Sequence, residues 1–201
     1  MSTTSTHLPN SNIEDQYSVP DGEERSSFVI LSGCSGGGKS TLLSELAKRG
    51  YSVVSEPGRQ IVKEQIGIGG ASLPWTNKDM FAELLLSRYM FSFNSASETS
   101  KYTFFDRSII DIVAYYDHIG QTLPEHFERA VRQYRYHRKV FLTPPWPEIY
   151  RNDSERKHTF AQAAASYDAH IKAYERLGYE VFEMPKASAS ERADFILENL
   201  S

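Results

Sequence analysis

Short apolar runs alternate with segments of helical periodicity along most of the chain. Five runs are rich in Val, Phe or Tyr and have the length of buried strands; they span residues 26–33, 51–57, 101–108, 138–145 and 179–185. Between them, apolar residues recur at helical spacing and stop at a glycine: Leu42, Leu43, Leu46 and Ala47 before Gly50, and Phe160, Ala164, Tyr167, Ile171 and Tyr174 before Gly178. Strands that alternate with helices predict an α/β fold, a parallel sheet covered by helices.

Composition supports one domain of ordinary size. The chain has 201 residues, of which 40% are hydrophobic and 24% charged, enough to bury a single core. A formal net charge of −4 argues against a general nucleic-acid binder, because phosphate contacts need a basic excess. Residues 1–24 are polar and lack an apolar signal core, so we expect a disordered tail there and the folded domain over 25–201.

Cysteine usage and hydropathy favour a cytoplasmic protein. Cys34 is the single cysteine, so no intrachain disulfide can form, and this suits a reducing compartment. The sequence contains no run of about 18 apolar residues that would cross a membrane. We therefore expect a cytoplasmic protein without a membrane partner, and the pattern contains no heptad repeat that would indicate an oligomer.

The stretch ILSGCSGGGKSTLL carries a phosphate-binding motif. Gly33, Gly38, Lys39 and Ser40 fit G-x-x-x-x-G-K-[ST], and the stretch lies between a predicted strand and a predicted helix, as this motif requires. In such a loop the lysine reaches the β- and γ-phosphates, and the serine can ligate Mg²⁺. A merely glycine-rich turn would not need these residues at these offsets. ATP with Mg²⁺ is therefore the expected cofactor.

The backbone of the whole loop is expected to hold the nucleotide. Glycines let successive N–H groups face a polyphosphate, and the helix N-terminus adds a partial positive charge. Cys34 is interpreted as a filler of the loop, with oxidation sensitivity as the alternative. The expected nucleotide-binding residues are Gly33, Cys34, Ser35, Gly36, Gly37, Gly38, Lys39, Ser40 and Thr41.

The third predicted strand ends in FFDRS, which offers a second part of the site. Asp106 is a candidate for the acid that holds Mg²⁺, directly or through water. A carboxylate at a strand end is also a common helix cap, but the nearby phosphate loop favours the metal role. Arg107 is either the ion-pair partner of a structural acid or a clamp for the second substrate.

The second predicted strand ends in SEPGRQ at the carboxyl edge of the sheet, where open α/β sheets bind ligands. Glu56 there is a candidate base for the proton of an attacking hydroxyl, and a solvated turn acid is the alternative. Arg88 shares a helical face with Phe81, Leu84 and Leu85, so it needs a partner. A buried ion pair and an anionic substrate both satisfy that need.

A charged segment, YRNDSERKH, follows the fourth predicted strand at residues 150–158. It is either a solvated helix start or a mobile lid that carries Arg151 and Arg156 over the transferring phosphate.

These motifs together resemble known kinases. The phosphate loop, EPGR after strand two and DRS after strand three are similar to motifs of thymidylate and deoxynucleoside kinases. SEPGRQIVKEQ, FFDRSIIDIVAYY, TPPWPEIYRNDSERK and YERLGYEVFEMP more closely resemble the NadR-like AAA-domain P-loop ATPases, over residues 27 to 200. The resemblance implies a three-layer P-loop NTPase fold, a five-stranded sheet of order 2-3-1-4-5, ATP with Mg²⁺, and a lid over about 146–160.

The resemblance also implies roles for particular residues. Phosphate contacts fall on Lys39, Ser40 and Thr41, and metal binding falls on Asp106 with Ser40. The acceptor side comprises Glu56, Arg59 and Arg107, and the lid comprises Arg151 and Arg156; Arg88 is kept as a further acceptor candidate.

Other P-loop classes fit less well. A GTPase would carry N-K-x-D after a late strand, but TNKDM has Met80 in place of the Asp and precedes the third predicted strand. A ring-forming motor needs a further helical domain, for which residues 146–201 are too few. We therefore predict transfer of the ATP γ-phosphoryl group to a small nucleoside- or nucleotide-like acceptor, with an ATPase or a non-catalytic nucleotide sensor as the alternative.

Overall fold

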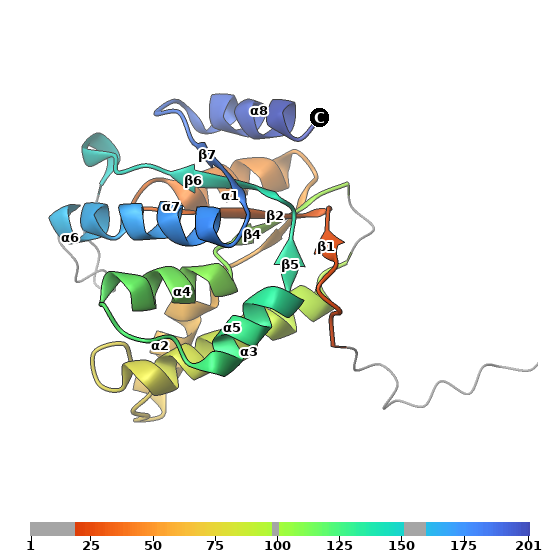
Figure 1. Ribbon diagram of the computed structural model, residues 1–201. Coiled ribbons are helices and arrows are strands. Elements are labelled where there is room, and N and C mark those ends of the chain that lie inside the picture. Colours follow the sequence, from red (N-terminus) through yellow and green to blue (C-terminus); the bar gives the residue numbers. More distant parts are fainter. Residues whose placement is uncertain (1–18, 98–100, 151–159) are drawn as a thin grey trace, which may run out of the picture.

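The computed structural model of the protein describes residues 19–97, 101–150 and 160–201 (Figure 1). Its centre is a five-stranded parallel sheet in the order β3-β4-β2-β6-β7. These strands are β2 (Phe28–Gly33), β3 (Ser52–Val54), β4 (Thr103–Asp106), β6 (Lys139–Thr143) and β7 (Glu180–Glu183). Numbered along the predicted strands, this order is 2-3-1-4-5, so both the α/β class and the strand order are confirmed.

Helices cover both faces of the sheet and make three layers (Figure 1). On one face, α1 (Lys39–Lys48) and α8 (Ala189–Asn199) pack on Val29 and Leu31 of the central strand. On the other face, Phe28 and Ile30 of the same strand meet α3 (Lys78–Ser95), α4 (Ile109–His118), α5 (Glu125–Gln133) and α7 (Tyr167–Arg176). The central strand is buried on both sides, as its continuous apolar run predicts.

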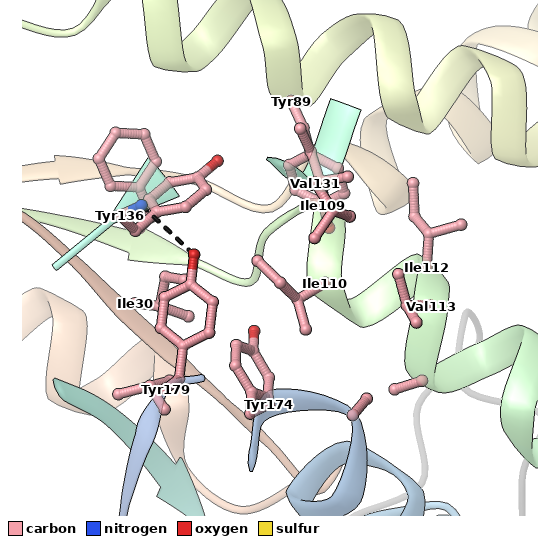
Figure 2. Packing of buried hydrophobic residues seen from close by; sticks show 14 of the residues in the cluster. Ile30, Tyr89, Ile109, Ile110, Ile112, Val113, Val131, Tyr136, Tyr174 and Tyr179 are labelled. Carbon is pink, nitrogen blue, oxygen red and sulfur yellow. Dashed lines mark hydrogen bonds between the residues drawn. The ribbon is translucent and has the colours of Figure 1, made fainter. Parts of the chain in front are cut away.

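Tyrosines fill much of the core between the sheet and helices α3, α4, α5 and α7 (Figure 2). Tyr136, Tyr174 and Tyr179 are nearly fully buried, so their polar atoms need partners; the Tyr136 hydroxyl has none among the described residues. The Tyr136 N–H donates to the Tyr179 hydroxyl at 3.4 Å, and the Tyr174 hydroxyl donates to Asp111 at 2.7 Å. The ring of Tyr174 thus packs in the core while its hydroxyl reaches the polar cluster described below.

All five predicted strands are longer than the observed ones, and two of them were extended into turns that carry charged residues. β3 stops at Val54, because Pro57 is the first residue of α2 (Pro57–Gly67) and Glu56 occupies the N-cap position, without a capping hydrogen bond from its side chain. β4 stops at Asp106, because Arg107 takes a positive φ of 66° and Ser108 caps α4. Both changes place a charged side chain in the turn at the carboxyl edge instead of in the sheet.

The predicted helix over 160–178 is divided in two. α6 (Phe160–Ala165) ends before Ser166, and α7 follows. Tyr167 and Tyr174 are buried as predicted, but Ile171 is only half-buried, and Ala47 in α1 is exposed. The 3₁₀ turn Pro147–Ile149 lies between β6 and the residues that precede α6.

A small second sheet was not predicted. β1 (Glu24–Arg25) pairs in parallel with β5 (Arg135–Tyr136). The expected tail, 1–24, lies mostly outside the described residues, but Pro20 is buried and Glu24 belongs to β1. Within the described part of the chain, no helix is both long and apolar enough to span a membrane.

Candidate active site

The glycine-rich loop between β2 and α1 is shaped by two glycines. Gly33 has φ +104°, and a Cβ there would lie 2.5 Å from the Thr143 carbonyl oxygen. Gly38 caps α1 in the left-handed conformation, with φ 78°. Cys34 N–H donates to the Thr143 carbonyl at 2.8 Å. The loop is thereby fixed against the end of β6, and a side chain at Gly33 would push it away.

Lys39 is buried at the base of the loop. Its Nζ donates to the Cys34 carbonyl at 3.1 Å, and the side chain has no carboxylate within salt-bridge distance among the described residues. Burial and then the charge of Arg107 lower the pKa of Lys39 to about 8. A bound polyphosphate would supply the missing negative charge, so the lysine suits the phosphate role expected of it.

A cavity of about 630 Å³ opens beside the loop. It continues past the loop along α1 to the end of β3 and the start of α2. Most of the predicted site residues meet there; those that line it are Ser35, Gly36, Gly38, Lys39, Ser40, Thr41, Glu56, Arg59, Asp106 and Arg107. Gly33, Cys34 and Gly37 belong to the loop but do not line the cavity. One cavity is therefore lined both by residues expected to hold the nucleotide and by residues expected to contact the acceptor.

Asp106 ends β4 next to the loop, since it is in register with Leu31 of β2. Its Oδ1 is buried and accepts no hydrogen bond from any described residue. Burial is the main cause that raises the pKa of Asp106. A carboxylate oxygen without a partner at this place fits a divalent cation or its bound water.

Ser40 is the other protein ligand expected for Mg²⁺, and its exposed side chain lines the same cavity. The described residues contain no group of three or more His, Cys, Asp or Glu side chains that would hold a metal. Mg²⁺ is commonly held by one or two protein ligands together with substrate phosphates and water, and Asp106 and Ser40 offer that number.

Glu56 and Arg107 form an ion pair in the cavity. Glu56 Oε1 lies 3.3 Å from Arg107 Nε. Arg107 is also held by Asp111, whose Oδ1 lies 2.8 Å from Arg107 Nη1. Although burial opposes the charge, the two carboxylates raise the pKa of Arg107, which therefore stays cationic. Its positive φ is unusual for a residue with a side chain and occurs where surrounding contacts hold the backbone.

Asp111 is the centre of a buried polar cluster that the sequence reasoning missed. It accepts from the Ser108 N–H at 2.9 Å and from the Tyr174 hydroxyl at 2.7 Å, and Ser32 of β2 also donates to it. Burial opposes its ionisation, but His170, Arg107 and the hydrogen bond from Ser32 lower the pKa of Asp111. The carboxylate therefore stays charged and anchors Arg107.

His170 completes the cluster. Its Nδ1 lies 2.7 Å from the Ser166 carbonyl oxygen, which can only accept, so Nδ1 carries a hydrogen. Its Nε2 lies 3.2 Å from Arg107 Nη1 and 3.3 Å from Asp111 Oδ1. The S-x-x-D spacing of Ser108 and Asp111 is a helix-capping signal in the sequence, but the spacing gives no sign that His170 and Tyr174 reach the same carboxylate.

The remaining predicted residues fall elsewhere. Arg88 lies in α3 and pairs with Glu64 of α2 at 2.9 Å. Both side chains are 42% exposed, so the pair exists but is not buried, and Arg88 does not line the cavity. Arg151 and Arg156, together with most of the expected lid, lie outside the described residues.

The parallel sheet with its loop defines the P-loop kinase fold, a three-layer α/β class of nucleotide-binding domains. Residues 28–192 match the family described as AAA domain, and the chain belongs to that family. This membership was expected from the sequence motifs. No curated protein matches the chain.

Solved structures of kinases share the fold. Deoxyadenosine kinase from M. mycoides with bound dATP is 16% identical, with a TM-score of 0.59 and coverage of 86% of this chain and 98% of that one. Thymidylate kinase from Candida albicans is 11% identical, with a TM-score of 0.61 and coverage of 88% and 91%. Shikimate kinase from Acinetobacter baumannii in complex with shikimate is 13% identical, with a TM-score of 0.53 and coverage of 88% and 93%. At these identities the likeness is one of fold.

Proposed function

We propose that the protein is a kinase that transfers the γ-phosphoryl group of ATP to a small acceptor, of nucleoside or nucleotide type. One observation carries the proposal: Glu56 and its partner Arg107 line the same cavity as Lys39 and the loop. A protein that only bound or hydrolysed ATP would need the loop but not a carboxylate and an arginine beyond it.

The proposed reaction uses the residues in distinct roles. The loop and Lys39 hold the polyphosphate, while Asp106 and Ser40 are the residues that would hold Mg²⁺. Bound Mg²⁺ neutralises charge on the β- and γ-phosphates. Glu56 takes the proton of the acceptor hydroxyl as its oxygen bonds to the γ-phosphorus, and the bond from that phosphorus to the β–γ bridging oxygen breaks to release ADP.

The ion pair also bears on the kind of acceptor. The charge of Arg107 is already balanced by Glu56 and Asp111. An acceptor phosphate would have to draw Arg107 away from these carboxylates, whereas a hydroxyl can accept from Arg107 and donate to Glu56. The arrangement therefore favours the hydroxyl of an unphosphorylated acceptor. Arg59, at the cavity edge, is proposed to contact the acceptor, and Arg151 and Arg156 are proposed to act from the lid.

The test is a transfer assay with ATP labelled at the γ-phosphate and Mg²⁺. The purified chain is offered nucleosides, nucleoside monophosphates and small alcohols such as shikimate, with the Lys39→Ala variant as the matched negative. Label that appears in an acceptor only with the unsubstituted chain supports the kinase. Release of inorganic phosphate alone identifies an ATPase, and ATP binding without turnover identifies a nucleotide sensor.

A further inference from the structure

Arg192, far along the chain from the loop, is buried beneath it. It lies in α8, on the face that packs toward α1, and its residue exposure is 3%. Its Nη2 donates to the Gly37 carbonyl at 3.1 Å, and its Nη1 lies 3.4 Å from the Gly38 carbonyl oxygen. Its guanidinium carbon also lies 5.8 Å from the centroid of the Trp146 ring. The side chain therefore joins α8, the phosphate loop and the segment after β6.

This cation is less well compensated than the other buried arginine of the site. Arg107 has two carboxylate partners. Among the described residues Arg192 makes no ion pair, and its Nε is buried without an acceptor. Burial lowers the pKa of Arg192. Placing a charge in such surroundings is unfavourable unless an anion approaches, and the neighbouring cavity is the one expected to receive a polyphosphate.

The contacts also fix the direction of two peptide groups. In a trans peptide the carbonyl and the following N–H point in opposite directions, and the described chain has no cis peptide bond. Holding the Gly37 carbonyl toward Arg192 therefore turns the Gly38 N–H away from it. The Gly38 carbonyl faces both Arg192 and the Leu42 N–H, which donates to it at 3.2 Å, so the Lys39 N–H also points away. Both Gly38 and Lys39 line the cavity.

From these observations we infer that Arg192 is a positioning residue of the nucleotide site. It aligns the N–H groups of Gly38 and Lys39 for the polyphosphate and supplies positive charge behind the loop. This inference rests on nucleotide binding at the loop, as in the proposed function, but not on phosphoryl transfer. The ligand it concerns is the di- or triphosphate part of the nucleotide rather than the base.

The experiment compares Arg192→Met with Arg192→Lys. The first removes the charge, whereas the second keeps it but has a single nitrogen in place of the two that contact the Gly37 and Gly38 carbonyls. ADP and ATP affinities are measured by calorimetry at low and moderate salt. We expect Arg192→Met to weaken both about tenfold to a hundredfold, as for a hydrogen-bonded charge. Arg192→Lys should recover part of the loss, most at low salt. In NMR spectra, the Gly38 and Lys39 amide shifts on ADP addition should be smaller in Arg192→Met.

Arg49→Met is the matched control, because Arg49 ties α1 to α8 through Asp194 and Ser190 without contacting the loop. It should lower the melting temperature but leave ADP affinity unchanged.

Equal ADP affinity in a folded Arg192 variant and the unsubstituted chain overturns the inference, and so does an equal loss in Arg49→Met. If Arg192→Met does not fold, Arg192→Lys decides by the same comparison. An unsubstituted chain that binds neither ATP nor ADP overturns both proposals, whereas one that binds them without phosphoryl transfer overturns only the kinase.

Discussion

Arg107 Nε lies 3.3 Å from Glu56 Oε1, across the turn ends of two neighbouring strands. The pair joins the residue after β4 to the residue before α2, so it fixes the proposed acceptor side of the cavity relative to the sheet. Because Arg107 is also held by Asp111, the pair is connected to the buried cluster under α4. Changes to Asp111 should therefore reach Glu56 through Arg107.

The first prediction concerns the lysine of the loop. Lys39→Ala removes the charge that is proposed to contact the β- and γ-phosphates, so ATP affinity or turnover should fall at least about tenfold. Lys48→Ala, at the exposed end of the same helix, is the control and should change neither. Calorimetry and steady-state rates measure the effect. Unchanged ATP binding and turnover in Lys39→Ala would rule out the phosphate role.

The second prediction concerns pH. Because the pKa of Lys39 is lowered to about 8, part of the folded protein lacks this proton above that pH, while the unfolded chain keeps it up to the ordinary lysine range. A polyphosphate favours the charged lysine, so binding should take up a proton and affinity should fall by up to about tenfold per pH unit above 8. The same lowered pKa makes this group's contribution to stability rise with pH over that range.

Proton uptake is measured by calorimetry in buffers of different ionisation enthalpy between pH 7 and 9.5. Lys39→Arg is the control, because an arginine does not titrate between pH 7 and 9.5. Its ATP affinity, whether high or low, should not change with pH in this way. An ATP affinity of the unsubstituted chain that stays constant to pH 9.5 would contradict the lowered pKa or the phosphate contact.

The third prediction concerns the buried carboxylate. Asp111→Asn removes the charge that compensates Arg107 and replaces an acceptor by a donor among Ser108, Tyr174 and Arg107. We expect the free energy of unfolding to fall by about 3–5 kcal/mol, the usual cost of breaking a buried pair. Asp117→Asn, in a half-exposed pair with Arg176, should cost about 0–1 kcal/mol. Urea unfolding of both variants decides, and equal small losses would contradict the central role of Asp111.

Much of this architecture could be predicted because it depends on local signals. Alternating buried runs indicate strands, and the glycines around Lys39 identify the loop before any contact is known. The strand ends at Asp106 and Glu56 bring charged residues to one edge, because carboxyl ends of parallel strands lie together. The predicted strands extend past the observed ones at their ends, among them the two where Pro57 starts α2 and the positive φ of Arg107 starts a turn.

The missed residues depend on contacts between distant segments. Arg192 reaches the loop from more than 150 residues away along the chain, and His170 and Tyr174 reach Asp111 from α7. In the sequence Arg192 and His170 are ordinary polar positions on amphipathic helices, and Tyr174 is one of the apolar positions of a helical stripe. Arg88 is the reverse case, because its apolar neighbours suggested burial, whereas α3 turns other residues inward, among them Leu86, Tyr89 and Phe93.

The fourth prediction separates a kinase from an ATPase and concerns Glu56. Glu56→Gln keeps the size and the contact with Arg107 but loses the basicity, so ATP should still bind while transfer to the acceptor falls. General-base catalysis is worth about a hundredfold to ten-thousandfold, and a loose phosphoryl-transfer transition state asks less of the base. Glu64→Gln is the control and should keep full activity, because Glu64 lies in α2 and pairs with Arg88 of α3 outside the cavity. Transfer and background ATP hydrolysis are measured in one preparation, because a lost base should slow transfer far more than hydrolysis by water. Transfer that survives Glu56→Gln excludes an essential base at this position, whereas an equal fall in both activities would mean that Glu56 acts by placing Arg107 and not by taking the proton.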